Sequence, residues 1–456
     1  MPRQRDLVLL LLAALQATAI FGQPPVTRLN PAVKQIVDMI SEDRIGATMK
    51  TLESFGTRYV LSEQDSATHG IGAAQTWIFD EFKSYSPRLQ VSLNPFTAKK
   101  SQRIAKDVAL ANVIAVLPGT VEPDRYVVIS SHYDSINMRR GPGTPRTDDE
   151  GPRAPQEIEP VAPGVSDNAS GVAAVLEMAR VMSQYEFDKS VVFIAFSAEE
   201  VGLLGSQAYA AKARQEKMEI EAVLNNDIIG NDIAGNGRSA NGHVRVFSGG
   251  PEDSSSRALA RYTKEIAERY VPSMTVDLIF RRDRFGRGGD HTSFNREGFA
   301  AVRLTTPSEN YANQHTASDT LANASVPYAA RVARMNGAVL ASLALAPRPP
   351  VVMRPRAPGR PPGSTSSTAT QAPAQSPAGR PAGPGLTRGK SGYDAALRWE
   401  MPKPEPDLAG YAVVIRSTTS PLWEREIYVG NVTEYTIPDL SIDDVVINSR
   451  TAVSEP

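Results

Sequence analysis

The chain has no cysteine among its 456 residues, and it has only five histidines. Without cysteine there is no disulfide, no cysteine nucleophile and no zinc finger built on thiolates. Any zinc ion must therefore be held by histidine, aspartate and glutamate side chains.

The chain also has no excess of charge of either sign, because 49 Lys and Arg residues face 50 Asp and Glu residues. This balance gives no electrostatic reason to expect a nucleic acid or an anionic membrane as a partner. Hydrophobic residues make up 41% and charged residues 22%, which is typical of a globular protein. The length is sufficient for two or three domains.

Long apolar runs are absent except near the N-terminus. Arg3 and Arg5 precede the apolar stretch 7–15, and small residues follow as far as Gly22. This pattern predicts a signal peptide over residues 1–22. The alternative is an uncleaved N-terminal anchor, although the run is short for a membrane-spanning helix. We therefore expect an exported protein, periplasmic or extracellular, without a membrane span after signal cleavage. An exported chain without cysteine suggests a bacterial origin.

Strand-like and helix-like segments alternate between residues 30 and 346. Short β-branched and apolar runs such as 126–130 and 191–196 predict buried strands, whereas the periodic segments 169–182 and 326–345 predict helices. This alternation predicts an α/β fold. We expect a three-layer α/β/α sandwich with a mixed, largely parallel central sheet.

The composition changes after this region. Proline, glycine, alanine, serine and threonine dominate residues 347–392, which predicts a linker. Short alternating strands in residues 393–456 predict a small all-β, sandwich-like module. The stretches 397–400 and 407–411 resemble a fibronectin type III domain. The segment is short for such a domain, and residues 448–456 do not continue the strand pattern, which leaves its completeness open.

Two adjacent carboxylates, Glu199 and Glu200, follow the buried strand predicted at 191–196. Ligand sites of open α/β sheets form at the carboxyl ends of strands. Because neighbouring anions repel each other, a nearby cation would make this pair easier to tolerate. The alternative interpretation is a solvated pair that opens a helix.

Further potential metal ligands recur at predicted strand ends or in glycine-containing loops. His132 has an aspartate two residues later, Asp134, which could hold its other ring nitrogen. An aspartate before the helix 169–182 could instead be a helix N-cap. These candidates are His132, Asp134, Asp167, Asp227, Asp290, His291 and His315.

The order His, Asp, Glu-Glu, Asp, His resembles the co-catalytic zinc aminopeptidases of metallopeptidase family 28. This resemblance implies two Zn²⁺ ions per chain, with Co²⁺ or Mn²⁺ as substitutes. It implies that His132, Asp167 and Asp227 bind one ion, and that Asp167, Glu200 and His315 bind the other. Asp167 would then bridge the two ions.

The resemblance extends over residues 31–345 and implies roles for other residues. Glu199 would be the general base, close to a metal-bridging water but not itself a ligand. Asp134 would orient the ring of His132. Asp290 and His291 would line the substrate site.

The sequence departs from the family pattern next to its last histidine. Many relatives have a tyrosine there that can stabilise an oxyanion, but this chain has Gln314. Tyr311, four residues before His315, is a candidate substitute and a candidate substrate-binding residue. A basic cluster at residues 281–287 is either a site for a substrate carboxylate or a solvated loop.

These features together predict an exported zinc metalloexopeptidase, an aminopeptidase that acts on the N-termini of peptides or proteins. A carboxypeptidase or a glutaminyl cyclase of the same family is one alternative. An inactive binding or adhesion module is another. The ligands for two metals argue against a single-zinc cyclase, and the retention of Glu199 beside Glu200 argues against an inactive module. The sequence indicates neither the oligomeric state nor the preferred N-terminal residue.

Overall fold

The structure is a computed structural model that describes residues 29–138, 161–251, 254–353, 387–388, 394–401, 403, 408–440 and 445–453. The described residues form two compact units, one comprising residues 29–346 and one drawn from residues 347 onward. In the described part of the chain, the helices are too short or too polar to span a bilayer.

An eight-stranded sheet lies at the centre of the first unit, in the order β1-β2-β4-β3-β5-β8-β6-β7. The four strands β4, β3, β5 and β8 are parallel, as are β6 and β7, whereas β1–β2, β2–β4 and β8–β6 are antiparallel pairs. The predicted mixed sheet with a parallel centre is confirmed. Its strands are β1 (Gln90–Ala98), β2 (Val108–Leu117), β3 (Glu122–His132), β4 (Lys189–Phe196), β5 (Glu219–Asn226), β6 (His243–Phe247), β7 (Thr275–Ile279) and β8 (Ala301–Thr305).

Strand β4 shows why the sheet needs helices on both faces. Its odd-numbered residues from Val191 to Ala195 belong to one hydrophobic core, and its even-numbered residues from Val192 to Phe196 belong to another. Because successive side chains of a strand point to opposite faces, a strand that is apolar throughout must be covered twice. The predicted three-layer arrangement follows from this pattern.

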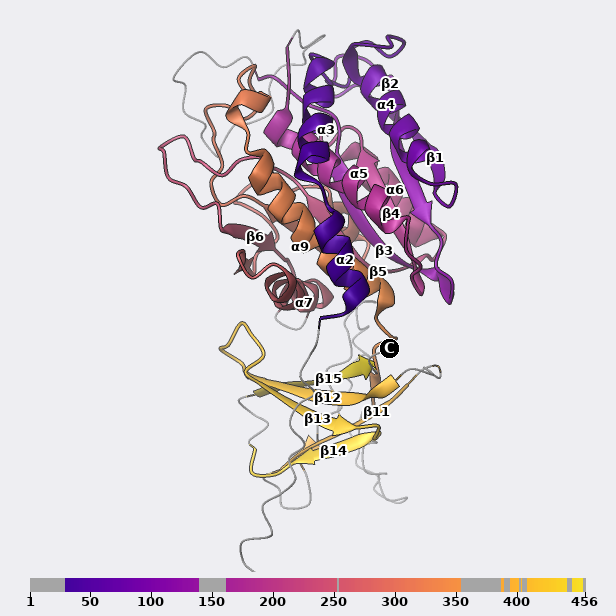
Figure 1. Cartoon of the computed structure of the whole chain (residues 1–456), viewed down its shortest axis with the longest axis vertical. Coiled ribbons are helices and arrows are strands. Elements are labelled where there is room, and N and C mark those ends of the chain that lie inside the picture. Colours follow the sequence, from indigo (N-terminus) through magenta and orange to yellow (C-terminus); the bar gives the residue numbers. More distant parts are fainter. Residues whose placement is uncertain are drawn as a thin grey trace, which may run out of the picture. The chain divides into compact units, whose positions relative to one another are not determined.

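Helices cover both faces of the sheet (Figure 1). The larger core lies under α2, α3, α4, α5, α7 and α9, and α5 packs beside α9. The smaller core includes residues of α6 and α8. These helices are α2 (Pro31–Met39), α3 (Glu42–Ser54), α4 (Gly70–Tyr85), α5 (Ser170–Met182), α6 (Leu204–Gln215), α7 (Ser255–Tyr270), α8 (His291–Arg296) and α9 (Val326–Leu345).

The second unit consists of two small sheets. One contains β9 (Val351–Val352), β10 (Thr387–Arg388), β11 (Ala395–Glu400) and β14 (Glu434–Ile437); the other has the order β13-β12-β15, with β12 at Leu408–Ser417 and β13 at Arg425–Gly430. Apolar residues of β11, β12 and β14 share one core around Trp399.

The end of this unit differs from the sequence-based expectation. Val445–Val453 forms strand β15, which pairs with β12 in antiparallel fashion. We expected residues 448–456 not to continue the strand pattern, and for residues 448–453 this was wrong. The polar residues 448–450 interrupt the apolar alternation, but backbone pairing with an existing strand does not require that alternation. The strands β9 and β10 also come from the segment predicted as a linker.

Candidate metal centre

Three candidate residues lie at the carboxyl ends of neighbouring parallel strands. His132 is the last residue of β3 and pairs with Phe196 at the end of β4. Glu200 lies in the turn after β4, and Asp227 follows β5 directly. Because parallel strands end at the same edge of the sheet, their terminal side chains meet there.

The other two candidate ligands come from loops. Asp167 lies in the short turn Val165–Ala169 that leads into α5, with the non-helical dihedral angles φ −119° and ψ 88°, and its peptide bond to Asn168 is cis. His315 lies in the loop between β8 and α9, with a φ of 58°. A left-handed backbone is uncommon for a residue with a side chain, so the surrounding contacts must hold His315 in place.

The five candidate ligands form two groups that share one carboxylate. Oδ1 of Asp167 lies 3.2 Å from Nε2 of His132, and Oδ2 lies 3.0 Å from Nε2 of His315. Asp227 completes the first group, with Oδ1 3.6 Å from Nε2 of His132. Glu200 completes the second, with Oε2 3.1 Å from Nε2 of His315. Their exposed fractions are at most 8%, so the site is buried.

The geometry of these groups fits a small divalent ion in each. Two ligand atoms placed tetrahedrally at about 2.0–2.1 Å from zinc lie about 3.3 Å apart. The measured separations of 3.0–3.6 Å bracket this value. In addition, the buried Oε1 of Glu200 has no hydrogen-bond partner in the described residues. Buried polar atoms without partners are costly, and a metal ion would satisfy them.

The site also favours positive charge. Burial by itself lowers the pKa of His132, but Asp134, Asp167 and Asp227 outweigh it and raise this pKa well above the usual value. Burial likewise lowers the pKa of His315, but Glu200 and Asp167 raise it to about 9. Burial raises the pKa of Glu199 well above its usual value, and the neighbouring Asp227 and Glu200 add to this effect. These surroundings suit a cation that replaces protons.

Asp134 connects His132 to the adjacent residues Glu199 and Glu200. Its carboxylate accepts hydrogen bonds of 3.1 Å from the backbone N–H groups of Glu199 and Glu200. The same carboxylate lies 3.6 Å from Nδ1 of His132, whereas the backbone carbonyl of Asp134 lies closer to Nδ1, at 3.1 Å. Asp134 thus fixes the turn that presents both glutamates as well as contacting the histidine ring.

Asp319 holds the backbone of the shared carboxylate residue. Its two oxygens accept hydrogen bonds of 2.8 Å from the N–H of Ser166 and 3.0 Å from the N–H of Asp167. Burial raises the pKa of Asp319 to about 7, although the two backbone donors act in the opposite direction. No role was predicted for Asp319 from the sequence, although it lies only four residues after His315.

The fully buried Arg58 ties the two loops of the site together. Its guanidinium donates to the carbonyl oxygens of Tyr133 at 2.7 Å and of Gly164 at 2.8 Å. Gly164 has a φ of 53°, and a Cβ there would lie 2.6 Å from Cβ of Ser135. Glycine is therefore required at this position. No sequence signal pointed to Arg58, because its partners are backbone atoms distant in the chain.

Gln314, the residue directly before His315, contacts the shared carboxylate. Its Nε2 donates a hydrogen bond of 2.7 Å to Oδ2 of Asp167, and 6% of its surface is exposed. Tyr311 lies in the same loop with an exposed fraction of 45%.

The side chains of the adjacent residues Asp290 and His291 have different surroundings. Asp290 precedes α8, is fully buried, and has a pKa raised to about 7, chiefly by burial. His291 points its Nε2 at the carbonyl of Arg282, 2.7 Å away, and donates to it, since a carbonyl can only accept. Neither residue belongs to the groups of described residues that could hold a metal ion.

The arginines of the predicted basic cluster, residues 281–287, differ in exposure and in partners. Arg281 and Arg282 are exposed, and the guanidinium of Arg281 lies 4.1 Å from the ring centre of Phe285. Arg284 instead pairs with the buried carboxylates of Asp283 and Glu309.

Comparison with protein families matches residues 112–340 to the family described as "Peptidase family M28". A probable zinc metalloprotease of Pyrenophora tritici-repentis is 31% identical over 454 residues, covering 92% of this chain and 94% of the relative. A probable zinc metalloprotease of Pyricularia oryzae is 34% identical over 466 residues, covering 94% and 83%. Both relatives are fungal, so they do not support the bacterial origin expected from the sequence.

Solved structures share the fold at lower identity. LapA aminopeptidase of Legionella pneumophila has a TM-score of 0.52 at 21% identity, covering 71% of this chain and 77% of LapA. BSAP, a zinc aminopeptidase from Bacillus subtilis, has a TM-score of 0.51 at 14% identity, covering 67% and 96%. A Macrostomum lignano glutaminyl cyclase has a TM-score of 0.53 at 16% identity, covering 72% and 95%. The coverage and identity of the two fungal relatives, together with the family match over half of the sequence, establish that this chain belongs to peptidase family M28.

Proposed function

We propose that this protein is an exported two-zinc aminopeptidase, which removes N-terminal residues from peptides or proteins. The observation that carries this proposal is the position of Asp167, whose two oxygens face two different histidines at 3.2 and 3.0 Å. A carboxylate shared in this way suits two metal ions held close together, the arrangement used for hydrolysis by two-metal enzymes.

The five buried ligands would hold the ions as the resemblance implies. His132, Asp167 and Asp227 make up one of the compact groups, and Asp167, Glu200 and His315 make up the other. When bound, the two ions would lower the pKa of a water molecule and stabilise negative charge on the scissile carbonyl oxygen.

The residues around the ions divide the remaining tasks. Glu199 would accept a proton from the attacking water and return it to the leaving amine. Asp134, which accepts hydrogen bonds from the backbone of Glu199 and Glu200, would keep one glutamate on the metal and its neighbour free of it. Asp319 and Gln314 would hold the shared carboxylate in its bridging orientation.

Several parts of the proposal rest on the sequence. Export rests on the signal pattern of residues 1–22, which lie outside the described residues. The sandwich-like C-terminal unit, predicted to be of fibronectin type III, would be a separate module without a part in catalysis. Asp290 and the loop of Tyr311 are proposed to line the substrate site.

The experiment is a parallel measurement of metal content and of hydrolysis by the purified mature protein. The substrates are amino-acid p-nitroanilides, dipeptides with a free or blocked N-terminus, and an N-terminal glutaminyl peptide. The proposal expects about two zinc ions per chain and chelator-sensitive release of N-terminal residues only from unblocked substrates. Cleavage of substrates with a blocked N-terminus would favour a carboxypeptidase, and cyclisation of the glutaminyl peptide would favour a cyclase. Two bound zinc ions without any turnover would contradict an enzymatic role.

A further inference from the structure

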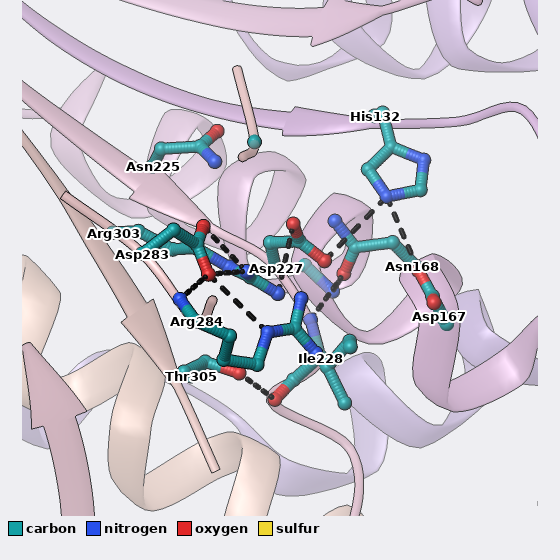
Figure 2. Close-up of polar contacts among 12 residues, drawn as sticks. His132, Asp167, Asn168, Asn225, Asp227, Ile228, Asp283, Arg284, Arg303 and Thr305 are labelled. Carbon is teal, nitrogen blue, oxygen red and sulfur yellow. Dashed lines mark hydrogen bonds and ion pairs between the residues drawn. The ribbon is translucent and has the colours of Figure 1, made fainter. Parts of the chain in front are cut away.

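A buried arginine contacts one of the candidate metal ligands from behind. Nη2 of Arg303 lies 3.1 Å from Oδ2 of Asp227, while the other carboxylate oxygen, Oδ1, faces His132 (Figure 2). Arg303 lies in β8, and its side chain is fully buried. Asp227 is therefore held between a cation on one side and the metal group on the other.

Arg303 is itself fixed by a second carboxylate. Its Nη1 donates to both oxygens of Asp283, at 2.9 and 2.8 Å, and Asp283 is almost fully buried. Asp283 also accepts a hydrogen bond of 3.2 Å from Nε of Arg284 (Figure 2). The planar guanidinium can bridge two carboxylates at once because it presents several donors in a rigid fork.

The charges of this network balance only when the metal ligand is included. Arg284 and Arg245 both pair with the buried carboxylate of Glu309. Three arginines thus face the two carboxylates of Asp283 and Glu309, and Asp227 supplies the third negative charge. Asp227 therefore serves as a counter-ion of the network as well as a candidate ligand.

The second metal group is supported differently. In the described part of the chain, the ion pairs of Glu200 and of Asp167 are with histidines alone. The additional donor to Asp167 is the neutral amide of Gln314. Among the described residues, only the group that contains Asp227 therefore has an ion-paired arginine behind one of its carboxylates.

We infer that Arg303 is a positioning residue, which holds Asp227 so that Oδ1 alone is presented to the metal ion of the His132 group. This inference rests on the proposed function, because it requires two metal ions. Residues that contact a metal ligand from behind help to fix its orientation, and their loss typically lowers metal affinity or activity about 10- to 100-fold. Loss of Arg303 therefore affects the ion of the His132 group and leaves the ion of the Glu200 group in place.

The test measures metal ions per chain against buffered free zinc, on the full-length mature protein and on variants. A single Arg303 substitution would leave Asp283 buried with fewer cationic partners, so the main variant is the double substitution Arg303→Met with Asp283→Asn. This pair removes one positive and one negative charge and keeps the network balanced. Arg303→Lys retains the charge but lacks the fork that reaches both carboxylates.

We expect both variants to lose one of the two ions at about 10- to 100-fold higher free zinc than the wild type does, with the other ion unaffected. The reference is Asp227→Asn, which removes the ligand itself. Adding the double substitution to Asp227→Asn should cause no further loss, because the effect of Arg303 passes through Asp227. If Arg303 only stabilised the fold, its loss would instead weaken the binding of both ions equally.

The two-metal function and the role of Arg303 are contradicted by different results. A wild-type protein that never binds a second ion contradicts the proposed two-metal function. A wild-type protein that binds two ions, together with a double variant that binds both with unchanged affinity, contradicts the role of Arg303. If Arg303→Lys binds both ions as the wild type does, charge and not the fork is what matters, and the positioning role is rejected.

Discussion

Gln314 donates a hydrogen bond of 2.7 Å from its Nε2 to Oδ2 of Asp167, the same oxygen that lies 3.0 Å from Nε2 of His315. A neutral amide thus supports the shared carboxylate from the residue directly before a candidate ligand. The amide fixes the carboxylate without adding charge to a site that already contains several buried acids.

Replacing this amide should weaken metal binding. In Gln314→Ala, Asp167 loses a donor and can turn away from its bridging orientation, so we expect zinc affinity to fall about tenfold or more. Metal content against buffered free zinc measures this. Gln184→Ala is the matched control, because Gln184 is exposed and donates only to the backbone of its own helix region. An unchanged zinc affinity in Gln314→Ala would show that Asp167 does not depend on this contact.

Glu199→Gln should separate catalysis from metal binding. The amide cannot accept the proton of the attacking water, whereas the candidate ligands stay as they are, so we expect turnover to fall about 10²- to 10⁴-fold with two ions retained. Steady-state kinetics and metal analysis of the same sample measure both. Glu200→Gln is the comparison, and it should lose metal. A Glu199→Gln protein with wild-type turnover would remove Glu199 from the role of general base.

The stability of the first unit should fall at low pH because of Asp283. Burial by itself raises the pKa of Asp283, but Arg303 and Arg284 outweigh it and hold this pKa well below its usual value of 3.8. A carboxylate with a depressed pKa stabilises the fold above its unfolded pKa, and that stabilisation is lost as the pH falls below about 4.

The comparison of wild type with Asp283→Asn tests this pH dependence. At pH 6 the variant leaves buried arginines with fewer counter-ions, so we expect its free energy of unfolding to be about 3–5 kcal/mol lower. This difference should shrink between pH 4 and pH 2. Urea unfolding with a chelator present measures it without a contribution from metal release. A constant difference over this range would show that Asp283 is not the titrating group.

Removal of residues 347–456 should leave catalysis intact. Every candidate site residue precedes this segment, and the core around Trp399 contains no residue of the two cores of the first unit. We expect kcat/KM of the truncated protein on small substrates to stay within about twofold of the full-length value. A folded but inactive truncation, with normal circular dichroism and metal content, would show that the second unit contributes to the site.

The candidate ligands could be predicted because they obey a local rule. Strands of β-branched and apolar residues can be recognised from their composition, and polar residues directly after them lie at one edge of a parallel sheet. His132, Asp227 and the Glu199–Glu200 pair follow from this rule and from the family resemblance. Taken alone, the position of Asp167 before a helix favoured an N-cap, whereas in the structure its side chain contacts two histidines.

The supporting residues could not be predicted in this way. Arg303 does offer a signal, because it is a charged residue among the apolar residues 301, 302 and 304 of one strand, and such a charge is buried only if it is paired. Arg58 and Asp319 contact backbone groups far away in the sequence, and no spacing rule connects a side chain to a distant carbonyl or N–H group.

The sequence by itself determined the α/β class, the order of the candidate ligands along the chain and the exclusion of thiolate chemistry. These properties depend on composition and on short-range periodicity. Only the tertiary structure decided that Asp167 faces both histidines, that Gln314 contacts it, and that Arg303 lies behind Asp227. The physical reason is that a side chain's partner depends on distance in space, which the close packing of helices on the sheet fixes.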